Sequence, residues 1–191
     1  QEKILNIKKR LNKVKRRRNV QRNLRKNNNF KTVALIGYTN AGKTLLFNKL
    51  TKKKQSSRSR LFETLDTKIS RVYLGENIYI GLIDTVGFIN NIPTSLIESF
   101  KATLEEVNTA DILLNIVDIN DLNAKQKIRV TKNILKDTGV EKNKISEMIT
   151  IYNKIDLKEF KSSHHYKKNY ISALTGEGVS DLKKILKNSL I

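Results

Sequence analysis

Short apolar runs alternate with longer amphipathic stretches along most of the chain, from Lys31 to its end. The runs are rich in Ile, Val and Leu, as strands buried in a sheet are. They predict strands at Val33 to Ile36, Ile69 to Leu74, Tyr79 to Asp84, Ile112 to Val117, Ile149 to Tyr152 and Tyr170 to Ser172. The stretches between them predict helices at Lys43 to Lys52, Ser95 to Val107, Ala124 to Lys136 and Val179 to Lys187. This alternation predicts an α/β fold with a mainly parallel sheet and helices on both faces.

Two positions indicate where predicted helices begin and end. Ser95, with Glu98 three residues later and Pro93 before it, is typical of a capping box. Gly139 follows a predicted helix and is expected to stop it, because glycine readily adopts the left-handed conformation found at helix ends.

Residues 1–29 differ from the rest of the chain in both pattern and charge. Apolar residues recur there at spacings of three and four, at Ile4, Ile7, Leu11 and Val14. Lysine and arginine fill the other faces, which predicts a basic amphipathic helix. Two interpretations stay open for it: the solvated arm of a helical hairpin, or a helix that contacts RNA phosphates. We therefore expect a basic helical segment at residues 1–29, a hinge at Asn27 to Asn29 and one domain at residues 31–191.

The composition limits the range of functions. The 191 residues carry a formal net charge of +20, which favours a polyanionic partner such as nucleic acid, ribosomal RNA or an anionic membrane surface. No apolar run is long enough to span a bilayer. The chain has no cysteine, which fits a reducing compartment, the cytoplasm or an organelle such as a mitochondrion or plastid. Because it opens on Gln1 rather than methionine, we expect it to be a fragment of a longer protein.

The segment GYTNAGKT follows the first predicted strand and precedes a predicted helix. It fits the pattern Gly-x-x-x-x-Gly-Lys-Thr, whose glycines let successive backbone N–H groups surround phosphate oxygens. Lys43 is expected to neutralise the β and γ phosphates, and the Thr44 hydroxyl to bind Mg²⁺. The predicted nucleotide contacts are Gly37, Tyr38, Thr39, Asn40, Ala41, Gly42, Lys43, Thr44 and Leu45. An ordinary glycine turn explains neither the Lys-Thr pair nor its position.

A second segment, IDTVGF, ends another predicted strand. Asp84 is expected to hold Mg²⁺ through water, and the Gly87 N–H to sense the γ phosphate. The pattern Asp-x-x-Gly is weak evidence alone, but it supports a nucleotide site here because it follows the phosphate-binding loop in the sequence.

Two further segments, YNKID and ISALTGEG, predict recognition of guanine. The Asp156 carboxylate is expected to accept hydrogen bonds from guanine N1 and N2, which adenine does not offer in that arrangement. The other predicted base contacts are Asn153, Lys154, Ser172, Ala173 and Leu174. Among these, the Ala173 N–H is expected to reach guanine O6, and Ser172 to shape its turn. Since each motif closes a strand, the site is predicted at the carboxyl edge of the sheet.

Together with LFETLD and the block LIDTVGFINNIPTSLIESFKATLEEV, these motifs resemble the GTPase domain of HflX proteins, relatives of Obg among the Ras-like P-loop GTPases. The resemblance covers Lys31 to the end of the chain. The basic segment before it resembles the end of the helical linker of that family. The resemblance implies Mg²⁺-dependent GTP hydrolysis coupled to a conformational switch. It also implies association with the large ribosomal subunit and its RNA, in ribosome rescue or splitting, by a domain expected to be monomeric when free.

The resemblance also implies a threonine that senses Mg²⁺ in the switch segment. Thr64 is the predicted residue, and Thr67 is the alternative, because Thr67 stands where the family usually has proline. The preceding segment KKKQSSRSR is interpreted as a solvated loop, with an RNA contact as the alternative.

Phe88 follows Gly87, where many Ras-like enzymes carry a glutamine or histidine that orients the attacking water. A phenyl ring can neither donate nor accept that hydrogen bond, so slow intrinsic hydrolysis stimulated by a partner is expected. By resemblance, Asn40 matches the asparagine that helps to hold K⁺ in potassium-activated GTPases. A turn-forming asparagine without an ion is the alternative. Arg58 or Arg60 as an internal arginine finger is a further hypothesis.

Two other function classes are alternatives to the GTPase. An RNA- or ribosome-docking module with a degenerate nucleotide pocket would need neither Lys43 nor Asp84, whereas the enzyme needs both. An ATP-using enzyme is disfavoured by Asp156. A metal site at His164 and His165 is disfavoured because adjacent side chains usually point apart and no acidic cluster is nearby in the sequence.

Overall fold

The computed structural model describes residues 30–52, 68–85, 87–88, 104–157 and 169–190. The chain divides into two compact units, residues 1–31 and residues 32–191. The predicted basic helix at residues 1–29 and the predicted capping box at Ser95 lie outside the described residues.

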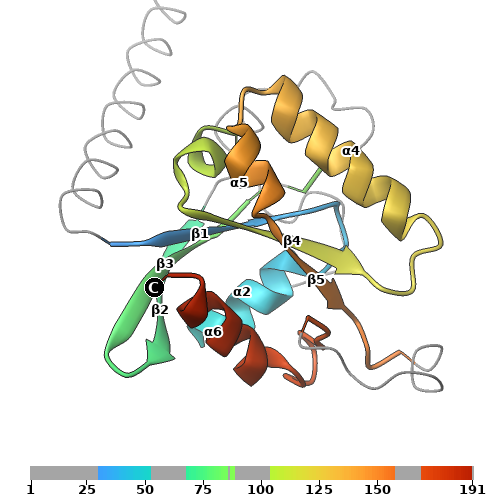
Figure 1. The fold of residues 1–191 in the computed structure, drawn as a ribbon. Helices are drawn as coiled ribbons and strands as arrows, with labels where there is room; N and C mark the ends of the chain where they lie inside the picture. The colour runs from blue at the N-terminus through green and yellow to red at the C-terminus, as the bar shows by residue number, and fades with distance from the viewer. Residues whose placement is uncertain (1–29, 53–67, 86, 89–103, 158–168, 191) are drawn as a thin grey trace, which may run out of the picture. The chain divides into compact units, whose positions relative to one another are not determined.

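The second unit is built around a sheet of five strands in the order β2-β3-β1-β4-β5 (Figure 1). Its strands are β1 (Thr32–Ile36), β2 (Lys68–Gly75), β3 (Ile78–Asp84), β4 (Ile112–Asp118) and β5 (Ile149–Asn153). β1 pairs in parallel with both β3 and β4, and β4 pairs in parallel with β5. Only the edge pair β2 and β3 is antiparallel among the described strands. The prediction of a mainly parallel sheet is confirmed.

Helices cover both faces of this sheet, as predicted. They are α2 (Lys43–Thr51), α4 (Ala124–Asp137), α5 (Lys142–Ser146) and α6 (Val179–Asn188), and residues 104–109 are also helical. Figure 1 shows α2 and α6 on one side of the strands and α4 and α5 on the other. None of the helical segments within the described ranges has the length and apolarity needed to cross a bilayer.

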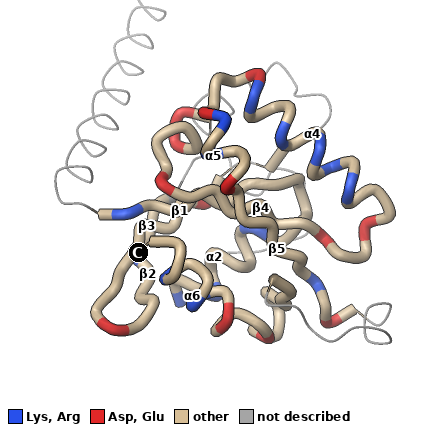
Figure 2. Tube along the Cα trace, viewed as in Figure 1, with Lys and Arg blue, Asp and Glu red and all other residues tan. Residues whose placement is uncertain are grey.

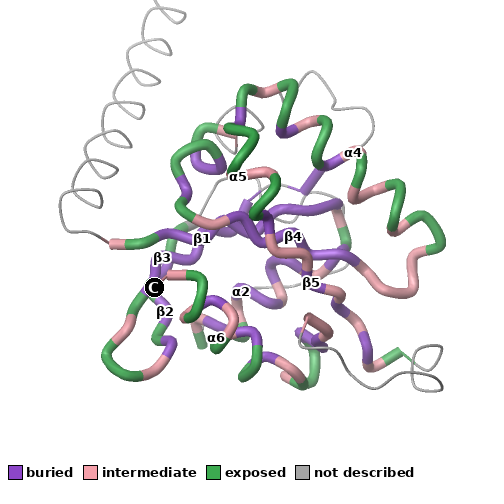
Figure 3. The backbone as a smooth tube through the Cα atoms, in the orientation of Figure 1, coloured by how far each residue is buried: buried purple, intermediate pink, exposed green. Residues whose placement is uncertain are grey.

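Alternate residues of the central strand enter two different cores. Val33 and Leu35 of β1 pack with buried residues of α2 and α6. Their neighbours Ala34 and Ile36 pack in the cluster that contains Leu135 of α4. Figure 3 shows the strands as the buried centre of the unit, while α4 turns an exposed face outward. A strand buried on both faces must be apolar at every position, which explains the unbroken run TVALI.

The predicted elements agree with the observed ones to within two residues at most described ends, with two exceptions. The strand predicted at Tyr170 to Ser172 is wrong: it forms a single bridge, between Tyr170 and Tyr152. The chain turns away from the sheet because the Ser172 N–H donates to the Glu177 carbonyl at 3.0 Å. The short helix α5 was not predicted, because its five residues include none that is buried and so give no apolar pattern.

Gly139 ends α4 as predicted. It adopts a φ of +81°, and the Val140 N–H donates back to the Leu135 carbonyl at 3.0 Å. The Gly139 N–H donates to the Lys136 carbonyl at 3.1 Å, which completes a Schellman motif. Val140 and Leu135 are both buried in the same core cluster, so this turn directs the chain back into the core.

Replacing Gly139 tests the conformational demand of this turn. A Cβ at Gly139 would meet no atom within 4 Å, so Gly139→Ala adds left-handed strain without a clash. We expect it to lower the free energy of unfolding in urea by about 1 kcal/mol. Gly139→Asn, whose side chain tolerates this conformation, should cost less. Equal losses for the two variants would contradict the assignment of the cost to backbone strain.

Candidate nucleotide-binding site

The segment between β1 and α2 forms a tight loop at the carboxyl edge of the sheet. Gly37, Asn40 and Gly42 all have positive φ angles, of 131°, 62° and 94°. The first helical hydrogen bond of α2 runs from the Leu46 N–H to the Gly42 carbonyl at 2.9 Å. A loop of this shape turns backbone N–H groups toward one centre in front of a helix N-terminus, which suits a phosphate.

Glycine is required at position 42 by contact as well as by conformation. A Cβ there would lie 2.2 Å from the Nδ2 atom of Asn153, which follows from the close approach of this loop to the end of β5. The first glycine of the motif, Gly37, is equally close to β4, because its Cβ would lie 2.3 Å from the Ile116 carbonyl oxygen. The two glycines therefore let the loop rest directly on two neighbouring strands.

The lysine of this motif lies inside the loop. The Lys43 Nζ donates to the Tyr38 carbonyl oxygen at 2.8 Å, and Lys43 is buried. Thr44 is also buried, at the first turn of α2. Leu45 turns toward the core and packs against its apolar cluster, which leaves its N–H as the group available to a phosphate.

The segment after β3 is hydrogen-bonded to the same loop. The Phe88 N–H donates to the Gly37 carbonyl at 3.0 Å, and the Thr39 N–H donates to the Phe88 carbonyl at 3.1 Å. Between these residues and the end of β3, the Thr85 hydroxyl donates to the Leu35 carbonyl at 2.5 Å. These bonds bring the predicted Gly87 against the predicted Lys43: a Cβ on Gly87 would lie 2.8 Å from the Lys43 Nζ.

Phe88 itself is fully buried. Its ring belongs to the core cluster that includes Ile36 and Ile83, on the α4 side of the sheet. A side chain at this position therefore points into the apolar core on the α4 side of the sheet.

Asn153, at the end of β5, joins the two loops in which phosphate and base contacts were predicted. Its Nδ2 donates to the Ala41 carbonyl at 2.8 Å, and its Oδ1 accepts from the Ala173 N–H at 2.9 Å. Both bonds are buried. The N–H predicted to reach guanine O6 thus already has a partner, so a base oxygen would share it with Asn153.

The carboxylate predicted to read guanine is held by a neighbouring hydroxyl. The Ser172 hydroxyl donates to Asp156 Oδ1 at 2.5 Å and also accepts from the Thr175 N–H at 3.0 Å. Ser172 is fully buried, whereas Asp156 is half-buried. The second carboxylate oxygen of Asp156 is therefore the one best placed for a ligand.

Two residues that the motifs did not reveal support Lys154. Lys154 has a φ of +71°, and its ammonium pairs with the Asp118 carboxylate at 2.7 Å. The Asn120 Nδ2 donates to the Lys154 carbonyl at 3.0 Å. Asp118 ends β4 and Asn120 follows it. Polar residues directly after a predicted strand were therefore the sequence signal that could have identified both as site residues.

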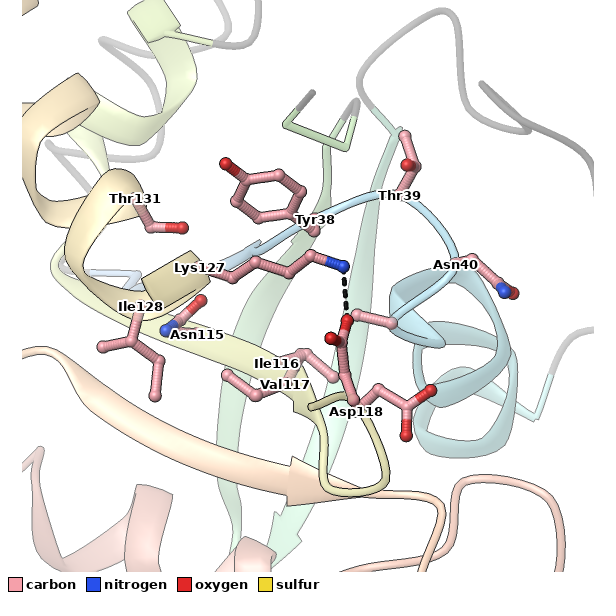
Figure 4. A pocket seen from close by; sticks show the side chains of 12 residues that line it. Tyr38, Thr39, Asn40, Asn115, Ile116, Val117, Asp118, Lys127, Ile128 and Thr131 are labelled. Atoms are coloured by element: carbon pink, nitrogen blue, oxygen red, sulfur yellow. Dashed lines mark hydrogen bonds and ion pairs between the residues drawn. The ribbon is translucent and has the colours of Figure 1, made fainter. Parts of the chain in front are cut away.

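A pocket of about 120 Å³ lies beside the phosphate-binding loop, between β4 and α4 (Figure 4). Lys127 of α4 pairs with Asp121 in this pocket and lies 5.3 Å from the centroid of the Tyr38 ring. The buried amide of Asn115 lines it and has no hydrogen-bond partner among the described residues, so the pocket offers it room for water. Asn40 also lines this pocket, with its side-chain amide turned outward from the centre of the pocket (Figure 4).

The charges around this pocket shift two pKa values. The hydrogen bond from Lys127 lowers the pKa of Asp121 below its ordinary value of 3.8. Burial raises the pKa of Tyr38 above its ordinary value of 10.0, and the Lys127 charge opposes that rise. Asp121 is therefore charged at neutral pH, and the stabilisation from its pairing with Lys127 is lost as the pH falls below 3.8 through the lowered pKa.

Thr44 and Asp84 are chemically suited to Mg²⁺. Hydroxyl and carboxylate oxygens are ligands that Mg²⁺ prefers, and both residues lie at the carboxyl edge, since Asp84 pairs in register with Leu35 of β1. Across the described ranges, no three His, Cys, Asp or Glu side chains are grouped to hold a metal. Such a site suits an ion that also binds phosphate oxygens.

Several predicted residues lie outside the described residues, so their predictions stay untested by the structure. They are Thr64, Thr67, Arg58, Arg60, His164 and His165. The structure brings together the other predicted residues along one edge of the sheet, where the side chain of Leu174 is exposed.

Removing the Asn153 amide should weaken the fold even without a nucleotide. Asn153→Ala leaves the buried Ala41 carbonyl and Ala173 N–H without their side-chain partner, so we expect the free energy of unfolding to fall by about 2 kcal/mol. Chemical denaturation of the nucleotide-free chain measures this. Asn143→Ala, at an exposed position of α5, serves as the control and should change stability by less than about 0.5 kcal/mol. Similar values for the two variants would contradict a structural role for Asn153.

Comparison with known proteins identifies this arrangement. A family model described as 50S ribosome-binding GTPase matches residues 32–154. The GTPase HflX of Caldanaerobacter subterraneus subsp. tengcongensis is 39% identical over 184 residues, which cover 96% of this chain and 42% of the relative. A chloroplastic GTP-binding protein of Arabidopsis thaliana is 41% identical over 128 residues, which cover 67% of this chain and 21% of the relative.

Solved structures give the same fold. A GTP-binding protein from Sulfolobus solfataricus in complex with GDP has a TM-score of 0.63 and 26% identity, covering 92% of this chain and 58% of that one. The chain spans less than half the length of the two sequence relatives. The fold, the site and the family model agree with the resemblance predicted from the motifs. The chain therefore belongs to the 50S ribosome-binding GTPase family, within its HflX group.

Proposed function

We propose that this chain binds GTP and GDP with Mg²⁺, hydrolyses GTP slowly, and acts as a conformational switch at the large ribosomal subunit. The observation that carries the proposal is the double contact of Asn153, which joins the phosphate-binding loop to the loop beside Asp156. This contact holds a phosphate site and a base site at one edge of the sheet, as a single nucleotide requires.

In this proposal the phosphates bind at the N-terminus of α2. The backbone N–H groups of the loop donate to the phosphate oxygens, and Lys43 leaves the Tyr38 carbonyl to neutralise the terminal phosphates. Thr44 and Asp84 hold Mg²⁺, which supplies charge neutralisation at the β and γ phosphates when bound. Thr64, or Thr67 in its place, would complete the switch together with Gly87.

The base is recognised on the other side of Asn153. Asp156, already oriented by the Ser172 hydroxyl, accepts from guanine N1 and N2, while Lys154 lies over the ring. Adenine lacks this pair of donors, which supports a preference for guanine nucleotides.

Slow intrinsic hydrolysis follows from the position of Phe88. Its buried ring has no polar group for the attacking water, so stabilisation of the transition state must come from elsewhere. We propose K⁺ near Asn40 as one source, since Asn40 is exposed, lies in the loop and turns its amide outward (Figure 4). The ribosome is the other proposed source.

A ribosomal partner is supported by the name of the matching family and by the charge of the chain. Five cations lie on α4: Lys125, Lys127, Arg129, Lys132 and Lys136. Figure 2 shows them along the length of this helix. A basic helix of this kind suits contact with RNA phosphates. We propose the cytoplasm as the compartment, with an organelle as the alternative suggested by the chloroplastic relative.

Base recognition is tested by Asp156→Asn. The substitution replaces one acceptor by a donor, so the affinity for GTP should fall at least about tenfold. Xanthosine triphosphate, which carries a carbonyl at carbon two, should gain affinity. Equilibrium titration of the two nucleotides and of ATP measures this. A native chain that binds ATP as tightly as GTP would contradict the proposal.

Turnover is tested by GTP hydrolysis with and without large ribosomal subunits. We expect a slow rate alone, stimulation by the subunits, and loss of activity in Lys43→Met. A docking module without catalysis would bind the subunits equally well with and without Lys43 and would show no turnover.

The same assay in K⁺ and in Na⁺ tests the cation. The rate should be higher in K⁺, and Asn40→Ala should remove the difference between the two ions. Equal rates of the native chain in both ions would remove K⁺ from the proposed function and leave the GTPase itself standing.

A further inference from the structure

We propose that Lys49 is a positioning residue for guanine recognition, which holds the loop beside Asp156 and so sets how long GDP stays bound. This inference rests on the proposed function, since it concerns the same site. Lys49 belongs to none of the sequence motifs and lies in the last turn of α2.

The Lys49 ammonium binds two consecutive carbonyl oxygens of that loop. Its Nζ donates to the Leu174 carbonyl at 3.3 Å and to the Thr175 carbonyl at 3.0 Å. An ammonium group has three donors and a positive charge, so it can satisfy both carbonyls at once. Lys49 thus contacts two residues that follow it in the sequence by 125 and 126 positions.

The next residue of the loop leaves space for this side chain. A Cβ on Gly176 would lie 2.6 Å from Lys49 Cε and 3.1 Å from its Nζ. The lysine stem therefore crosses the loop where any larger residue would displace it. Lys49 therefore contacts the loop with its aliphatic stem, which lies against Gly176, as well as with its ammonium group.

Among the described residues, the loop has few other anchors to the body of the protein. Leu174 is 64% exposed and Thr175 is exposed, so neither side chain is fixed by burial. Other hydrogen bonds of the loop are internal, such as the Gly176 N–H to the Ser172 carbonyl at 2.8 Å. Besides the contacts of Asn153 and Asp156, Lys49 is the side chain that ties the outer part of this loop to α2.

This tie links the two ends of the nucleotide site through one helix. α2 begins with Lys43 at the phosphates and carries Lys49 less than two turns later at the base loop. Holding Leu174 and Thr175 in place keeps the adjacent Ala173 N–H aligned for sharing with guanine O6. Loss of the tie should therefore loosen the O6 contact more than the contacts that Asp156 makes.

The test is Lys49→Met, which keeps the length of the stem and removes the donors. Dissociation of fluorescent GDP from the 191-residue chain should become about threefold to tenfold faster, as expected for an exposed hydrogen-bonded contact. The native preference for GDP over 6-thio-GDP, whose sulfur accepts hydrogen bonds weakly, should narrow in the variant. The preference for GDP over IDP, which reports the Asp156 contact to the amino group, should stay the same.

Two further variants separate positioning from charge and stability. Lys49→Arg keeps a donor for the carbonyls and should restore most of the GDP lifetime. Lys184→Met removes one exposed cation from α6 and should leave the GDP lifetime unchanged. An unchanged lifetime in Lys49→Met, or an equal loss for GDP and 6-thio-GDP, would overturn the inference.

These outcomes are distinguishable from failure of the proposed function. If the native chain showed no preference for guanine over adenine nucleotides, the proposed function would fail and this inference with it. A native chain with that preference and an unaffected Lys49→Met variant would overturn the role of Lys49 alone.

Discussion

The side-chain amide of Asn153 is the interaction on which the site depends. It reaches from the end of β5 to one carbonyl of the phosphate-binding loop and one N–H of the base loop, both buried. Because each loop is held through the same group, a change that loosens one alters the other. Coupling of this kind is reciprocal in free energy, so under the proposed function the contacts at the base and at the phosphates affect each other by the same amount.

The sheet supplies the geometry that this amide needs. β1, β4 and β5 run in parallel, so their carboxyl ends lie side by side and present their loops along one edge. The close approach of the loops leaves no room for a Cβ at Gly42, which ties the glycine of the motif to the position of Asn153. The positions of the two glycines in the motif thus follow from the packing of the loop after β1 against the ends of β4 and β5.

Much of this arrangement could be predicted because it depends on short sequence patterns. Buried strands are apolar throughout, and the glycines, lysine and carboxylates of the site stand at fixed offsets after them. The strand predicted at Tyr170 to Ser172 was wrong because a hydroxyl contact to Asp156 and a turn to Glu177 outweigh the local preference for a strand. The contacts of Lys49 and Asp118 were not predicted, because each residue pairs with one that is distant in sequence. Their partners Leu174, Thr175 and Lys154 lie within the guanine motifs, whereas Lys49 and Asp118 lie outside every motif.

The burial of Phe88 has a consequence for how such an enzyme can change. Its ring fills the core under α4 while its backbone is bonded to the phosphate-binding loop on both sides. A glutamine introduced there would place its amide among apolar side chains, at a cost of about 1–3 kcal/mol. A single substitution at Phe88 therefore cannot supply a group that orients water, and the segment after β3 would have to be repacked first; under the proposed function, the need for an outside activator follows from this packing.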